Sequence, residues 1–115
     1  MRSLLLLILF LPGILWAAQP NYTKTKTISI KTSAICGSCK KRLESGLSPL
    51  PGVVAVRLNL NNKKLSIKFD DQQTDPEKLK QAIAALGYQA DEMPPRKEAY
   101  TQLPECCRKP GLCND

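Results

Sequence analysis

Two kinds of hydrophobic spacing alternate along the middle of the chain. Apolar and polar residues alternate one by one over residues 26–33, 54–60 and 65–69, a pattern typical of β-strands that bury one face. Over residues 37–48 and 76–86, apolar residues instead recur every three or four positions, which indicates amphipathic helices that bury one stripe. We therefore predict the order strand, helix, strand, strand, helix.

The segments between these elements contain turn residues and helix boundaries, and the resulting order of elements indicates a fold class. Residues 61–62, both asparagine, tolerate the positive φ angles of a tight hairpin. Residues 74–77, Thr-Asp-Pro-Glu, form a helix start, and Gly87 is suited to end that helix. The short segment 88–90 then predicts an edge strand. The order βαββαβ predicts an α+β, ferredoxin-like fold, with a four-stranded antiparallel sheet and two helices on one face.

The N-terminal segment, residues 1–18, has the layout of a secretory signal peptide. Arg2 precedes an almost wholly apolar run over residues 4–16, and two alanines then offer a cleavage site. This run is shorter than the roughly 18 to 20 apolar residues that a membrane-spanning helix needs. We expect a periplasmic or secreted protein, with an uncleaved N-terminal anchor as the alternative.

Composition narrows the function classes. Lys and Arg number 17 against 10 Asp and Glu, which gives a net charge of +7, but only 5% of residues are aromatic. A basic surface without stacking aromatic residues does not indicate nucleic-acid binding and better fits an acidic partner. The chain has five Cys and no His, so it lacks the commonest general acid–base and mixed Cys/His zinc sites. We expect a binding protein and not an enzyme.

The candidate chemistry lies in the sequence Cys36-Gly37-Ser38-Cys39. We expect Cys36 in the loop after the first strand and Cys39 in the first turn of the first helix, whose N-terminus favours thiolates. Two thiolates at this spacing suit a soft ion such as Cu(I), Hg(II) or, less well, Zn(II). In a shallow surface site, two ligands leave room for a partner's thiols to enter, as a metal carrier requires.

Two other interpretations of this pair stay open. The same spacing suits a thiol–disulfide redox protein that uses Cys36 and Cys39, although that motif usually belongs with a thioredoxin-like element order, which is not predicted here. Cys39 also lies on the apolar stripe of its helix, so by itself it could be a small buried residue.

Three separated segments carry a family resemblance: Cys36-Gly37-Ser38-Cys39, Leu50-Pro51-Gly52-Val53 and Leu86-Gly87-Tyr88. With them, the predicted domain, residues 24–93, resembles the heavy-metal-associated domain of copper chaperones, metal-pumping ATPases and the periplasmic mercury-binding protein. The export signal makes the layout most similar to the last of these.

The resemblance implies a monomeric protein that binds one soft metal ion through Cys36 and Cys39. The resemblance also implies that the protein delivers this ion to another metal-binding domain or to a metal-transporting membrane protein. It also places Tyr88 close to the metal loop, although a tyrosine at the edge of the core with a solvated hydroxyl is an alternative interpretation. Ala34 stands where most members of the family have methionine.

The last segment, residues 94–115, has little apolar periodicity and predicts a flexible tail with three cysteines. Cys106 and Cys107 are adjacent and cannot easily bridge each other, but either could pair with Cys113 in an oxidising compartment. Alternatively, these cysteines form a second soft-metal site or add thiolates to the ion at Cys36 and Cys39.

Overall fold

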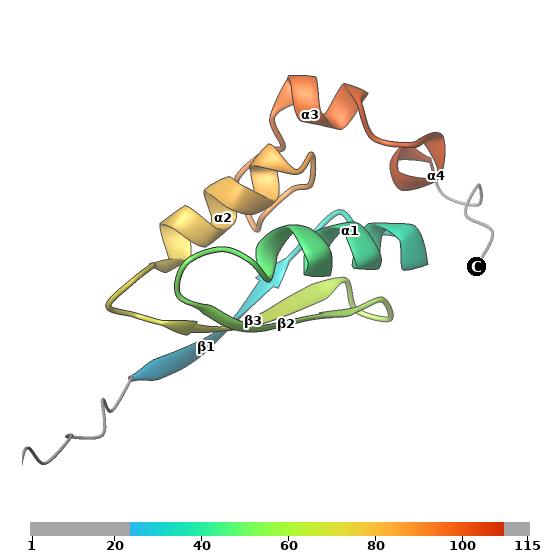
Figure 1. Cartoon of the computed structure of the whole chain (residues 1–115). Coiled ribbons are helices and arrows are strands. Elements are labelled where there is room, and N and C mark those ends of the chain that lie inside the picture. The colour runs from blue at the N-terminus through green and yellow to red at the C-terminus, as the bar shows by residue number, and fades with distance from the viewer. Residues whose placement is uncertain (1–23, 110–115) are drawn as a thin grey trace, which may run out of the picture.

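The computed structural model describes residues 24–109. These residues form an α+β structure in which helices cover one face of an antiparallel sheet (Figure 1). The sheet has the order β1-β3-β2 and consists of β1 (Thr25–Lys31), β2 (Val53–Asn59) and β3 (Lys64–Asp70). The helices are α1 (Gly37–Leu47), α2 (Pro76–Ala85), α3 (Lys97–Thr101) and α4 (Glu105–Arg108).

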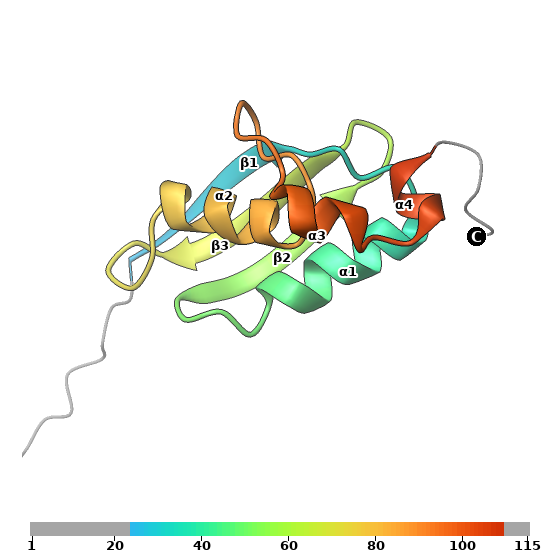
Figure 2. The same ribbon diagram turned by 90° about the horizontal axis from the view of Figure 1, so that it is seen from above.

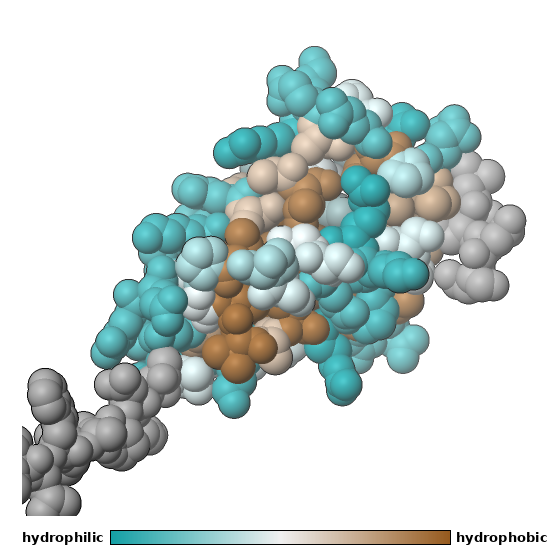
Figure 3. Space-filling model, viewed as in Figure 1, coloured by the Kyte–Doolittle hydropathy of each residue, from teal (hydrophilic) through white to brown (hydrophobic). Residues whose placement is uncertain are grey.

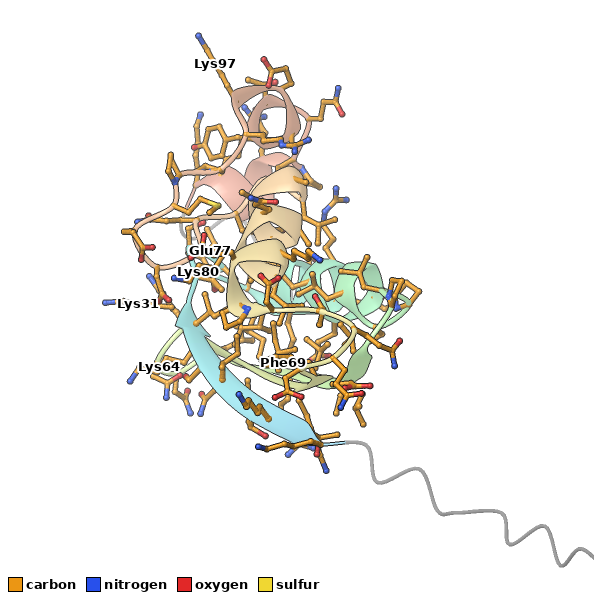
Figure 4. All side chains as sticks on the ribbon, turned by 90° about the vertical axis from the view of Figure 1, so that its left-hand side faces the viewer. Lys31, Lys64, Phe69, Glu77, Lys80 and Lys97 are labelled. Carbon is orange, nitrogen blue, oxygen red and sulfur yellow. The ribbon has the colours of Figure 1, made fainter. Side chains whose placement is uncertain are left out.

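The alternating residues of the strands build the core between the sheet and the helices. Leu65, Ile67 and Phe69 on the central strand β3 are at most 1% exposed, and Phe69 lies between the sheet and the helices in Figure 4. Lys31 and Lys64, which pair across β1 and β3, point away from the core (Figure 4). Burying an aromatic or aliphatic side chain contributes about 1.5–3 kcal/mol each, so this alternation fixes which face carries the helices.

A glycine lies at the contact between α1 and the end of α2. A Cβ atom at Gly46 would lie 2.8 Å from Cδ1 of Leu86, so the Leu86 side chain would have to move. The absence of a side chain at Gly46 therefore lets Leu86 pack directly against the backbone near the end of α1, whose other end carries the two cysteines of the motif.

The predicted fourth strand, residues 88–90, is wrong for the part of the chain that the structure describes. Ala90 forms only isolated bridges with Thr32 and Met93. The reason is a reversal directly after it: Asp91 has a φ of 51°, and the backbone N–H of Met93 donates back to the Ala90 carbonyl at 2.9 Å. The chain turns before a strand ladder can form, so residues 24–109 contain three strands.

The segment after Pro95, predicted as a flexible tail, contains α3 and α4 and packs on the domain. Leu103 and Cys107 are 3% and 4% exposed and belong to the main core. Gly87 has a φ of 99°, and a Cβ there would lie 3.0 Å from the Ala99 backbone. The chain after α2 thus lies directly against α3, and this contact directs the segment back across the helices toward α1.

Two predicted features lie outside the described residues: the signal peptide, residues 1–18, and Cys113. Within residues 24–109, none of the helices combines the length and the hydrophobicity that a membrane crossing requires. On the face shown in Figure 3, hydrophilic residues dominate the surface, and hydrophobic residues appear between them in a narrow band and around α4.

Candidate metal centre

Cys36 and Cys39 flank the start of α1. Cys36 is the N-cap residue, with extended backbone angles and no side-chain cap of the helix, and Cys39 lies in the first turn. Their Sγ atoms are 3.4 Å apart. Two sulfurs that each lie about 2.3 Å from one ion can be at most about 4.6 Å apart, so a single ion can contact both atoms after a small adjustment.

The loop before the pair is held by side-chain hydrogen bonds to its backbone. Thr32 Oγ1 donates to the Lys63 carbonyl at 3.1 Å and accepts from the Ala34 N–H at 3.3 Å. Ser33 Oγ accepts from the Gln89 N–H at 2.9 Å. Ala34 itself is fully buried, so the small residue at this position packs into the core and does not leave the loop unsupported.

The expectation of a shallow surface site is wrong for this structure. Cys36 is 4% exposed and Cys39 is 0% exposed. Cys39 lies on the buried stripe of α1 with Leu43 and Leu47. Cys36 is covered by α4, which lies beside the N-terminal end of α1 in both views of the ribbon (Figures 1 and 2). The Cys106 carbonyl is 3.7 Å from Cys36 Sγ, so the backbone of α4 itself covers the motif.

Helix α4 also brings its own cysteines to the motif. The Sγ atoms of Cys36, Cys106 and Cys107 all lie within 4.8 Å of one another, and those of Cys106 and Cys107 are 4.0 Å apart. The sequence offers a weak signal for this arrangement, because Leu103 and Cys107 are four positions apart, as on one face of a helix. Pro104 interrupts that pattern, which hid it among the polar residues of the segment.

The cysteines differ in redox state and in acidity. Cys36 is disulfide-bonded in the structure, whereas Cys39 and Cys107 are buried free thiols. Burial raises the pKa of the Cys107 thiol to about 12, with a further contribution from neighbouring Cys39. Metal ligation requires deprotonated sulfur, so an ion that uses Cys36 and Cys107 would need reduction at the first residue and proton loss at the second.

Tyr88 lies beside these thiols with its hydroxyl buried. The residue is 0% exposed, so the interpretation of a solvated hydroxyl is wrong. Burial raises the pKa of Tyr88, and the nearby thiols of Cys107 and Cys39 raise it further. Neither thiol makes a hydrogen bond of normal geometry with the hydroxyl, which has no partner among the described residues. A buried polar group without a partner is costly.

The Tyr88→Phe variant should show two separate effects of this hydroxyl: it lowers the stability of the metal-free protein, and it raises the affinity for metal. We expect the reduced, metal-free protein to gain about 1 kcal/mol in free energy of unfolding, because an unsatisfied buried group is removed. Metal affinity should fall by roughly tenfold, because the hydroxyl can donate to a metal-bound thiolate. Urea unfolding and competition with a chelator measure the two effects.

Tyr100→Phe is the matched control, since Tyr100 is 41% exposed. It should change neither the free energy of unfolding nor the affinity. A loss of stability in Tyr88→Phe would show that the hydroxyl has a stabilising partner, and this would contradict the interpretation.

The basic residues after the motif do not all face solvent freely. Lys40 Nζ lies 2.6 Å from Glu44 Oε1 and donates to the Leu58 carbonyl at 2.8 Å. Burial alone would raise the pKa of Glu44, but the hydrogen bonds from Lys40 and the Leu58 N–H outweigh it and hold the pKa below its usual range. Lys40 thus ties α1 to β2, while Lys41 and Arg42 stay exposed beside the motif.

Known proteins resemble this chain over the region that carries the motif. Residues 24–89 match the family model described as the heavy-metal-associated domain. The copper chaperone CopZ of Staphylococcus aureus (strain MRSA252) is 38% identical over 53 residues, which cover 46% of this chain and 78% of that protein.

Two solved structures are similar in fold to part of this chain. Oxidised MerP from Ralstonia metallidurans CH34 has a TM-score of 0.56 and 26% identity, over 59% of this chain and 96% of that one. The water-soluble region of the P-type ATPase CopA from Bacillus subtilis has a TM-score of 0.56 and 29% identity, over 59% of this chain and 46% of that one. The family model spans more than half of the sequence, and the chain therefore belongs to the heavy-metal-associated domain family.

Proposed function

We propose that this protein binds one soft metal ion through Cys36 and Cys39 and delivers it to the thiols of another metal-binding domain. The observation that carries the proposal is the 3.4 Å separation of the two sulfurs at the start of α1. Thiolates prefer soft ions, so Cu(I) and Hg(II) are the first candidates and Zn(II) is the weaker one.

The relatives support binding and delivery without catalysis. One curated relative is named a copper chaperone, and the similar structures include an oxidised MerP and a soluble part of a P-type ATPase. A chaperone and its acceptor can share this fold, so the partner we propose is a metal-transporting membrane protein with such a domain. We further propose that the protein is exported after cleavage of residues 1–18, which N-terminal sequencing of the mature protein checks.

The experiment is a metal titration of the full chain after complete reduction with a phosphine. We expect one Cu(I) or Hg(II) per chain, Zn(II) bound far more weakly, and transfer of the bound Cu(I) to a separate domain with a two-cysteine motif. Failure of the reduced protein to bind either soft ion at a one-to-one ratio would overturn the proposal.

Thiol–disulfide exchange through Cys36 and Cys39 is the second candidate. Cys36 does take part in a disulfide, but its partner is not Cys39, whose thiol is free, so the motif pair itself is not bridged. An oxidoreductase should turn over a substrate disulfide, and its reduction potential should lie in the range of known thiol–disulfide exchange proteins. A metal carrier of this fold should show no such turnover. Measuring both properties on the same preparation separates the two candidates.

A further inference from the structure

We propose that α4 supplies Cys106 and Cys107 as additional ligands, so that thiolates from two distant segments of the chain hold one ion. This inference rests on the proposed function and adds a second half to its site. The ion would be held by Cys36 and Cys39 at the start of α1 and enclosed from the other side by α4.

The sulfur positions suit this arrangement. Three sulfurs that surround one ion in a plane, each about 2.3 Å from it, lie about 4.0 Å apart. The Sγ atoms of Cys106 and Cys107 have that separation, at 4.0 Å, and both lie within 4.8 Å of Cys36 Sγ. Shifts of less than about 1 Å would therefore bring all three to bonding distance of one ion.

The Tyr88 hydroxyl is an independent observation that points to the same place. It is fully buried, has no hydrogen-bond partner among residues 24–109, and lies close to the thiols of Cys107 and Cys39. A neutral thiol is a weak hydrogen-bond acceptor, whereas hydrogen bonds to an ionised acceptor are about twice as strong as neutral ones. Conversion of these thiols to metal-bound thiolates would give the hydroxyl the partner that it lacks.

The position of α4 depends on contacts that involve no metal. Leu103 and Cys107 are buried in the core, and the Cys106 carbonyl lies 3.7 Å from Cys36 Sγ. Within the segment, Arg108 Nε donates to the Leu103 carbonyl at 3.1 Å and holds its local shape. The additional ligands are thus placed before the ion arrives. Preorganised ligands lose little conformational freedom on binding, so the extra sulfurs should strengthen binding and retain the ion against water and weak competitors.

The test compares the reduced full chain with the Cys106→Ser/Cys107→Ser double variant, each loaded with one Cu(I). X-ray absorption spectroscopy counts the sulfur neighbours, and chelator competition measures the affinity. We expect at least three sulfurs in the wild-type protein and two in the double variant. Loss of an outer-shell partner alone costs 10–100-fold, so the affinity should fall by at least about tenfold.

Cys113→Ser is the matched control, because it removes a thiol from the same segment of the chain. It should keep the wild-type sulfur count, and a drop to two sulfurs would transfer the role to Cys113 and overturn the assignment to α4. Two sulfurs in the wild-type protein, with one-to-one binding, would overturn this inference and leave the proposed function standing. Absence of binding in every variant would instead overturn the proposed function. If circular dichroism shows that the double variant does not fold, the number of sulfur neighbours in the wild-type protein is the test: three or more support the inference, and two overturn it.

Discussion

Replacement of Cys36 with serine should weaken soft-metal binding more than any other single cysteine substitution. Cys36 Sγ is 3.4 Å from Cys39 Sγ and lies within 4.8 Å of the sulfurs of Cys106 and Cys107. It is therefore common to the motif and to the group on α4. Loss of a second-shell partner costs 10–100-fold in affinity, so loss of this ligand should cost more than about 100-fold. Chelator competition with Cu(I) measures the change.

Ser38→Ala is the control for this substitution, because Ser38 lies between the two cysteines and its side chain is exposed. Its affinity should stay at the wild-type value. Cys39→Ser should have a smaller effect than Cys36→Ser, since it keeps the three sulfurs that lie within 4.8 Å of one another, whereas Cys36→Ser breaks up that group. If Cys36→Ser binds within tenfold of the wild-type protein, Cys36 does not have the central position that the structure indicates.

Replacement of Leu103 with alanine should cost about 2–5 kcal/mol in free energy of unfolding, the range for removing a buried leucine side chain. Leu103 is 3% exposed and packs in the core. A residue in a flexible tail would have no such effect, so this variant decides whether residues 97–108 belong to the folded domain. Urea unfolding of the reduced protein, followed by circular dichroism, measures the difference.

Leu60→Ala is the chemically matched control, because Leu60 is 37% exposed near the hairpin between β2 and β3. Its free energy of unfolding should change by no more than about 0.5 kcal/mol. Equal, small effects in the two variants would show that the segment after Pro95 contributes little to the stability of the domain.

The elements that the sequence predicts well are those whose own residues carry a periodic pattern. Each strand keeps its apolar residues on one face, and Leu43 and Leu47 continue the buried stripe of α1 that begins at Cys39. The helix start at Asp75 was also visible, and the structure shows its side chain accepting from the Lys78 N–H at 2.9 Å. The junction that places Cys36 and Cys39 follows from these local signals alone.

The features that the sequence did not predict depend on contacts between distant residues. Ala90 cannot extend a strand because the conformation of Asp91 reverses the chain, and no apolar pattern reports that reversal. Leu103 is buried in a packing in which Gly87 lets α3 approach the end of α2, and Cys107 follows it on α4. The packing of α4 over the two-cysteine motif therefore arises from tertiary contacts. A segment with only two buried residues has too little hydrophobic periodicity for the sequence to predict this packing.

The burial of Cys36 and Cys39 under α4 has a kinetic consequence for delivery. An incoming thiol of an acceptor domain can reach these sulfurs only after the covering segment has moved aside. With excess acceptor, the observed transfer rate would then stop rising with acceptor concentration and reach a plateau. The plateau would equal the rate constant with which residues 97–109 move away from the two cysteines. This conformational change, and not the encounter with the acceptor, would then limit the rate of metal transfer.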